Sequence, residues 1–285
     1  DPNGLSIAGE SPGRFAARHA ALAMATLATS GEAADCSPTD WLASMNQAVA
    51  RGLSALAPQG TRAGSTAAVV LDCGDELRFL IVGDSGVRIN ASELIWLHKD
   101  VDVIFTHGRV ATYQHLRARG LDGDELEQRT RQLMFKGLSA AAQFDLGAND
   151  VRAIVQAASQ ACAPRLKDDA QPLVEDLLMT GIARGQSVFA NRADHSLGYA
   201  LVNGGRTLGM DMLSFSRPKS QVRSIELFTD GYATCPAGVG LRAWEEEFAR
   251  VEALDFAKID AHPSVKGSTS AQFSDDRSVL VVQLQ

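Results

Sequence analysis

The chain has 285 residues, of which 45% are hydrophobic and 21% are charged, so it can bury an ordinary globular core and is not a disordered chain. It has 34 acidic and 27 basic residues, and its net charge of −7 excludes the basic surface of a general nucleic-acid binder. No apolar run approaches the roughly 18 residues of a membrane helix. We therefore expect neither a nucleic acid nor a membrane as partner.

The four cysteines point to a reducing compartment. Cys36, Cys73, Cys162 and Cys235 form no CxxC pair and no zinc-binding spacing. This usage is typical of reduced structural thiols, so we expect a cytoplasmic protein.

Two helices are expected at the start of the chain. Residues 13–30 are rich in Ala and have a helix-forming composition. Residues 40–57 carry apolar side chains at helical spacing, with Asp40 as the expected N-cap.

Short apolar strands are expected next. Residues 65–73 and 77–83 are rich in β-branched and other apolar side chains, and Gly74-Asp75 between them indicates a hairpin turn. Two further short strands are expected at residues 87–90 and 94–97. These strands are too close in sequence for parallel crossovers, which need a dozen or more residues, so they predict an antiparallel meander.

The rest of the chain is expected to alternate between helices and strands. Residues 100–185 have a mostly helical composition, with loop signals at residues 120–123 and at Ala163-Pro164. Strands are expected at residues 198–203, 224–229 and 278–284, and a helix at residues 241–258. The pattern predicts an α+β fold of antiparallel sheets covered by helices. Because no linker-like segment divides the chain, we expect a single domain over residues 1–285, with a mostly helical insertion at about residues 100–195.

Three acidic segments lie at the ends of apolar strands. They are Gly83-Asp84-Ser85, Thr229-Asp230-Gly231 and Asp275-Asp276-Arg277-Ser278. Carboxylates at strand ends can point into a common cleft and supply the oxygen ligands that Mg²⁺ or Mn²⁺ prefers. Two such ions roughly 3.5–4 Å apart can activate one water for attack on phosphorus. The alternative for any one segment is an ordinary turn residue.

The same segments carry a resemblance to a known family. Residues 64–88 (GSTAAVVLDCGDELRFLIVGDSGVR), 227–231 (LFTDG) and 275–282 (DDRSVLVV) resemble, in order and spacing, the signature segments of the metal-dependent protein serine/threonine phosphatases of type 2C. Residues 198–205 (GYALVNGG) resemble a further strand of that family. An excess of Arg over Lys and abundant Ala suggest a bacterial-type member.

The resemblance implies a fold and a set of metal ligands. The fold would be a four-layer α-β-β-α sandwich, in which two antiparallel sheets pack face to face with helices on both outer sides. A centre of two Mn²⁺ or Mg²⁺ ions would lie at one end of it. Asp230 and Asp275 would ligate the same ion, Asp84 would lie near a third metal site, and Asp1 would be the ligand that bridges the two ions.

The sequence departs from the family pattern in the first loop. The Gly and His that follow the bridging aspartate in many members are Pro2 and Asn3 here. The family also has two strands ahead of this loop, which carry a phosphate-binding Arg and an acidic ligand, and neither residue can be located. An upstream strand with that Arg and acid would favour an enzyme.

The resemblance implies hydrolysis of phosphoserine or phosphothreonine in a phosphoprotein substrate by a metal-activated water, with no catalytic side chain. We expect a monomer that uses two ions, with a third ion as an option. The helical insertion would cover the site and influence substrate choice. One alternative is a catalytically inactive pseudophosphatase that acts as a binding or regulatory module. Another is a phosphohydrolase for small phosphate esters.

Overall fold

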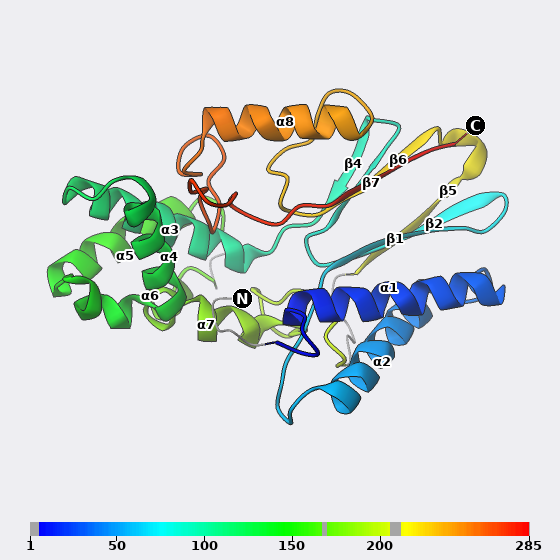
Figure 1. Cartoon of the computed structure of the whole chain (residues 1–285), viewed down its shortest axis with the longest axis horizontal. Coiled ribbons are helices and arrows are strands. Elements are labelled where there is room, and N and C mark those ends of the chain that lie inside the picture. The colour runs from blue at the N-terminus through cyan, green and yellow to red at the C-terminus, as the bar shows by residue number, and fades with distance from the viewer. Residues whose placement is uncertain (1–5, 167–169, 206–211, 285) are drawn as a thin grey trace. The chain divides into compact units, whose positions relative to one another are not determined.

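The computed structural model describes residues 6–166, 170–205 and 212–284, with Gln186 described by its backbone alone. Its internal contacts divide it into two compact units (Figure 1). The first unit contains the described residues up to Leu97, Tyr199–Thr229 and the strand that begins at Val279. The second contains His98–Gly198 and Asp230–Ser278. The helical region that we expected as an insertion therefore belongs to the same compact unit as residues 230–278. The expectation of a single domain over residues 1–285 stays a prediction.

The first unit begins with the two expected helices. They are α1 (Pro12–Ser30) and α2 (Pro38–Leu56). The N-cap of α2 is Ser37 rather than Asp40. Asp40 occupies the third helical position, and its carboxylate accepts the Ser37 N–H at 2.9 Å, which completes a capping box. The expectation for Asp40 was wrong because Ser37 is also a strong capping residue and precedes a proline suited to the first helical position.

Two antiparallel sheets follow. The first has the order β1-β2-β5, and the second has the order β4-β3-β6-β7. The strands are β1 (Ala67–Asp72), β2 (Glu76–Val82), β3 (Gly86–Ile89), β4 (Glu93–Trp96), β5 (Leu213–Pro218), β6 (Ser224–Phe228) and β7 (Val279–Gln283). A short 3-10 turn, η3 (Lys219–Gln221), precedes β6. The hairpin at Gly74-Asp75 is confirmed, and β3 pairs antiparallel with β4. The expected four-stranded meander was wrong, because β2 pairs with β5 and β3 with β6, so the two hairpins belong to different sheets.

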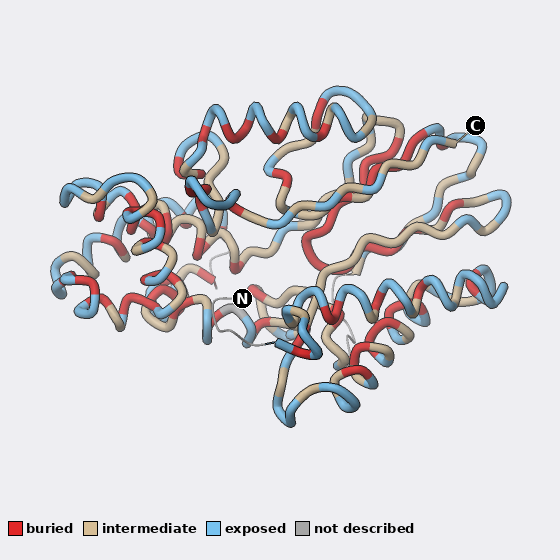
Figure 2. Tube along the Cα trace, in the orientation of Figure 1, coloured by how far each residue is buried: buried red, intermediate tan, exposed pale blue. Residues whose placement is uncertain are grey.

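Alternation along β2 divides the core of this unit into two parts. Phe79 and Ile81 pack with Val87 of β3 and Ile225 of β6, in the cluster between the two sheets. Leu80 and Val82 point to the other face and pack with side chains from α1 and α2. Figure 2 shows the resulting buried stripe on each helix and the buried β2 and β3. The α+β class, with two face-to-face antiparallel sheets and flanking helices, is confirmed.

One expected strand does not form, and one strand was not expected. Residues 198–203 form no strand, and Val202 makes only an isolated bridge to Ser65. The strand that completes the first sheet is β5, which the sequence analysis missed although apolar and polar residues alternate over Leu213-Ser214-Phe215-Ser216. Its Phe215 lies opposite Phe79 in the register, and their rings stack with centroids 4.7 Å apart. A cross-strand aromatic pair of this kind stabilises a sheet but cannot be read from either strand alone.

The second unit is helical, as expected for residues 100–185. Its helices are α3 (Asp100–Ala118), α4 (Gly123–Lys136), η1 (Leu138–Phe144), α5 (Ala148–Cys162), α6 (Leu173–Thr180), α7 (Ile182–Gly185), η2 (Gln186–Phe189) and α8 (Leu241–Leu254). Helix α3 packs against α4, α5 and α6.

Helix α8 is shorter than the expected 241–258. The Asp255 carboxylate accepts backbone N–H groups from Ile259, Asp260 and His262, at 3.0, 3.0 and 2.9 Å. Lys258 adopts a left-handed φ of 52°, and its Nζ donates to the Asp255 carbonyl at 2.7 Å. These bonds offer the backbone an alternative to another helical turn, so the helix ends at Leu254.

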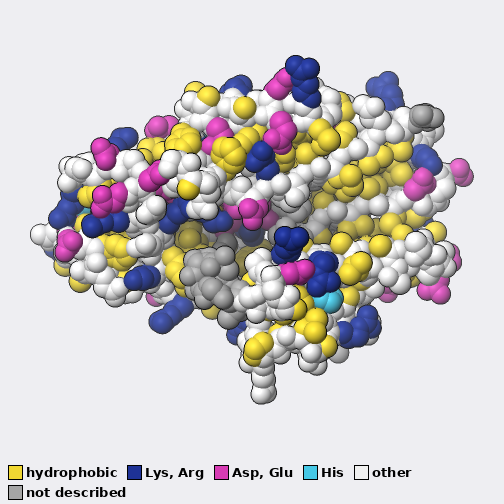
Figure 3. Space-filling model, in the orientation of Figure 1, with side chains coloured by type: hydrophobic (Ala, Val, Ile, Leu, Met, Phe, Trp, Pro, Cys, Tyr) yellow, Lys and Arg dark blue, Asp and Glu magenta, His cyan; other side chains and the backbone are white. Residues whose placement is uncertain are grey.

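Within the described ranges, no helix combines the length and apolar character that crossing a membrane would require. On the face drawn in Figure 3, acidic and basic side chains are interspersed over both α1 and α8.

Candidate functional site

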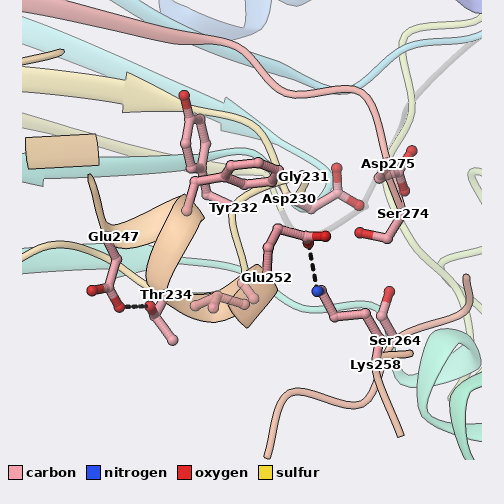
Figure 4. Close-up of a pocket in the computed structure, with 13 residues that line it drawn as sticks. Asp230, Gly231, Tyr232, Thr234, Glu247, Glu252, Lys258, Ser264, Ser274 and Asp275 are labelled. Atoms are coloured by element: carbon pink, nitrogen blue, oxygen red, sulfur yellow. Dashed lines mark hydrogen bonds and ion pairs between the residues drawn. The ribbon is translucent and has the colours of Figure 1, made fainter. Parts of the chain in front are cut away.

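A pocket in the second unit gathers four segments of the chain (Figure 4). The turn after β6, helix α8, the loop after α8 and the segment before β7 all contribute to its wall. The polar side chains that line it are Asp230, Tyr232, Thr234, Glu247, Glu252, Lys258, Ser264, Ser274 and Asp275. Asp230 and Asp275, which the motif resemblance assigns to the same ion, therefore line the same pocket.

A glycine lets the two acidic segments approach each other. A Cβ added at Gly231 would lie 2.1 Å from the backbone carbonyl oxygen of Asp276, well inside van der Waals contact. Because Gly231 has no side chain, its backbone can pack directly against the backbone of Asp276. This contact brings the neighbouring residues Asp230 and Asp275 close to each other.

Replacing Gly231 with Ala should force these two segments apart. We expect a loss of stability of about 1–3 kcal/mol, as for other overpacked sites. We also expect weaker Mn²⁺ binding, because the two carboxylates would no longer face one pocket. Chemical denaturation and Mn²⁺ titration measure the two effects. Gly13→Ala is the control, because a Cβ there meets only the Gly64 carbonyl oxygen, at 3.9 Å. Equal behaviour of the two variants would contradict this role for Gly231.

The segment before β7 is also held against helix α8 by the side chain of Arg277. The guanidinium of Arg277 lies 3.7 Å from the centroid of the Phe248 ring and donates to Glu245 at 2.7 Å. Both partners are on α8, so stacking and charge together hold Asp275 beside that helix. The Tyr232 hydroxyl also donates to Glu245, at 2.7 Å. Burial, with this hydrogen bond, raises the pKa of Tyr232 to about 12, so the phenol is protonated at neutral pH.

Two acidic side chains of the pocket are already engaged by the chain. Glu252 accepts from Lys258 Nζ at 2.5 Å and from the Ser268 hydroxyl at 2.6 Å, and all three residues are buried. Asp275 accepts from Lys266 Nζ at 3.0 Å and from the Asp276 N–H at 3.0 Å. Asp230 lies exposed at the pocket.

Helices α3 and α4 hold the loop that carries Lys258 and Ser264. Arg109 of α3 is fully buried and donates to the carbonyls of Ala257, Lys258 and Ser264 at 2.6, 2.9 and 3.2 Å. The same guanidinium pairs with the buried Glu127 of α4. These contacts collect three backbone acceptors of the loop around one cation.

Glu247 of α8 forms a second polar cluster in the pocket wall. It accepts from Arg250 at 2.7 Å and from the Thr234 hydroxyl. The hydrogen bond from Arg250 holds the pKa of Glu247 at about 2, below its usual 4.5, against the opposing effect of burial and with help from Thr234.

This depressed pKa predicts an acid-sensitive contribution to stability. A group with a lowered folded-state pKa stabilises the fold above its unfolded pKa, and the stabilisation is lost as the pH falls through its folded value. The free energy of unfolding should therefore fall by about 1 kcal/mol more in the wild type than in Glu247→Gln between pH 5 and pH 2, a small value because Arg250 is largely exposed. Urea denaturation across this range measures it. Parallel pH profiles for the two proteins would contradict the prediction.

The other two predicted ligands are in different situations. Asp84 belongs to the first unit, where it is buried at the end of β2 and its backbone carbonyl accepts from Trp96 Nε1 at 2.9 Å. Its role at a third metal site stays a prediction. Asp1, with Pro2 and Asn3, lies outside the described residues.

Asp230 and Asp275 fit a hard divalent cation. Mg²⁺ is usually held by one or two carboxylates together with several waters and substrate phosphates, and two carboxylates at one pocket meet that requirement. Within the described part of the chain, no group of three acidic, His or Cys side chains is arranged to hold a metal. The fit therefore rests on this pair, and the donor set is suited to Mg²⁺ or Mn²⁺ rather than to softer metals.

The pocket contains residues that the sequence analysis did not single out. Glu252, Lys258 and Ser264 lie in segments with no strand-end aspartate, and Ser274 directly precedes Asp275. The helix expected over residues 241–258 runs past Leu254, so the loop that carries Lys258 was not recognised. Glu245, Glu246 and Glu247 share one run of acids, and only their partners distinguish the exposed Glu246–Arg242 pair from Glu247 in the pocket.

Comparisons of the chain with protein-family models, with curated proteins and with solved structures found no match.

Proposed function

We propose that this chain is a metal-dependent protein serine/threonine phosphatase that hydrolyses phosphoserine and phosphothreonine esters. The observation that carries the proposal is the convergence of Asp230 and Asp275, 45 positions apart, on one pocket. The motif resemblance supports it, since it assigns these two carboxylates to one ion.

The residues of the pocket have distinct roles in this proposal. Asp230 and Asp275 would hold Mn²⁺ or Mg²⁺, which, when bound, supplies an activated water and neutralises charge on the phosphoryl group. Gly231 allows the two carboxylates to converge, and Arg277 holds the segment of Asp275 on α8. Lys258 neutralises the buried Glu252 and thereby limits the negative charge that faces a phosphate.

We place the protein in the cytoplasm as a monomer that acts on phosphoproteins. A phosphorylated side chain in an exposed segment could reach Asp230, because that residue is exposed at the pocket. The assignment of a protein substrate rests on the motif resemblance alone.

The test is release of phosphate from a phosphothreonine peptide by the full chain. Activity should require Mn²⁺ or Mg²⁺, disappear with EDTA and return when the metal is restored in excess. A nucleotide and a small aryl phosphate should be assayed in parallel. Turnover of the small esters without turnover of the peptide would indicate a small-ester phosphohydrolase. No turnover of any substrate by folded protein in millimolar Mn²⁺ would contradict an enzymatic function.

A pseudophosphatase is the second candidate, and the ion pair between Lys266 and Asp275 favours it. This pair neutralises one of the two carboxylates without a metal. Such a protein would bind the phosphothreonine peptide, in a titration by calorimetry or fluorescence, without releasing phosphate.

A further inference from the structure

Lys266 occupies the position of a cation at the candidate site. Its Nζ lies 3.0 Å from Oδ1 of Asp275, and Asp275 lines the pocket with Asp230. The Lys266 side chain is 49% exposed, and the Asp275 side chain is 28% exposed. The ammonium and the carboxylate are therefore both in contact with solvent, and the carboxylate also accepts from the Asp276 N–H.

The backbone around Lys266 is anchored on both sides. The Ser264 carbonyl accepts from the buried Arg109, at 3.2 Å. The Gly267 N–H donates to Glu127 at 2.8 Å, and the Gly267 carbonyl accepts from Arg131. A Cβ at Gly267 would lie 2.2 Å from Arg109 Nη2 and 2.5 Å from the Ala257 carbonyl oxygen, so this close approach requires glycine.

An anchored backbone with a long, exposed side chain limits where the ammonium can go. Lys carries a compact charge on a flexible four-carbon stem, so Nζ can leave Asp275 while its Cα stays in place. A divalent cation on the same carboxylate would repel the ammonium, because two positive charges at contact distance interact unfavourably even near a protein surface. Because its Cα stays in place, the Lys266 ammonium can move away from the ion by no more than the length of its side chain.

We propose that Lys266 is the phosphate-binding residue of this site: it neutralises Asp275 in the metal-free protein and moves to an oxygen of the phosphate monoester when a divalent cation binds. This inference rests on the proposed function and adds a substrate-binding residue to it. A phosphoryl group beside the ion offers three oxygens, and an ammonium is a common partner for them. Lys266 would thus compete with the metal and assist the substrate.

The two roles predict opposite effects of one substitution. Lys266→Gln should tighten Mn²⁺ binding about three- to tenfold, because it removes a competing positive charge. It should raise the KM for the phosphothreonine peptide and the inhibition constant of inorganic phosphate about tenfold, as expected for loss of one charge-assisted hydrogen bond. Lys266→Arg keeps the charge and should restore phosphate binding to within a few-fold.

The experiment uses the full chain and two independent measurements. Electron paramagnetic resonance of free Mn²⁺ gives the metal affinity without any turnover, and peptide kinetics with inorganic phosphate as inhibitor give the anion affinity. Lys219→Gln is the matched control, because Lys219 is similarly exposed and pairs with Asp72 at 2.5 Å in the first unit. The control should change neither quantity.

The outcomes separate this inference from the proposed function. If the wild type binds no Mn²⁺ and releases no phosphate, the proposed function and the inference are both wrong. If the wild type is active and Lys266→Gln alters neither affinity, Lys266 is only a surface ion-pair partner and the inference alone is wrong. Tighter Mn²⁺ binding with unchanged phosphate inhibition would also overturn the assignment of Lys266 as a phosphate-binding residue.

Discussion

Replacing Asp275 with Asn should lower kcat/KM for the phosphothreonine peptide by more than about 100-fold, because loss of a partner behind a metal ligand already costs 10–100-fold. Asn keeps the size of the side chain and removes its charge. The same substitution at Asp230 should have a similar effect, since both carboxylates line the pocket. Mn²⁺ affinity should fall in both variants.

The neighbouring acid supplies the matched control. Asp276 is exposed and is absent from the residues that line the pocket, although it follows Asp275 directly. Asp276→Asn should therefore keep activity within about threefold, because an exposed charge contributes little. Equal losses in Asp275→Asn and Asp276→Asn would show that the activity depends on the net charge of this segment and not on one ligand. Circular dichroism would establish that each variant is folded.

Replacing Arg109 with Met should destabilise the second unit by about 3–5 kcal/mol, the usual cost of removing one partner of a buried ion pair. The substitution leaves Glu127 without its guanidinium and three loop carbonyls without their donor. Because that loop carries Lys258 and Ser264, we expect the pocket to lose order together with stability.

Urea denaturation and hydrogen exchange measure the two parts of this prediction. The midpoint of unfolding should fall, and amides of residues 255–268 should exchange faster well below that midpoint. Arg242→Met is the control, since Arg242 is 92% exposed and pairs with Glu246 on the surface of α8. It should cost less than about 0.5 kcal/mol. A similar small cost for Arg109→Met would mean that the loop does not depend on Arg109.

Much of the first unit followed from local sequence. The hairpin at Gly74-Asp75 was predictable because a turn signal separates two apolar runs, and the register then follows from the turn. Helices α1 and α2 were predictable from composition and apolar spacing. The N-cap of α2 was not, because Ser37 and Asp40 are both good capping residues. Strand β5 was missed because its alternating pattern is only four residues long, and the partner that stabilises it, Phe79, lies in a strand far away in the sequence.

Part of the candidate site could likewise be predicted from local sequence, and part could not. Asp230 and Asp275 could be recognised from the sequence alone, because a carboxylate directly after or shortly before an apolar strand is a local signal. Only the tertiary structure placed both at one pocket, ended α8 at Leu254 and brought Lys266 to Asp275. These features depend on buried partners such as Arg109 and Asp255, whose contacts connect segments up to 155 positions apart. A buried polar group without a partner costs free energy, so each of these groups needs a partner that is close in the folded chain. Because such partners are far apart in sequence, no local pattern predicts them.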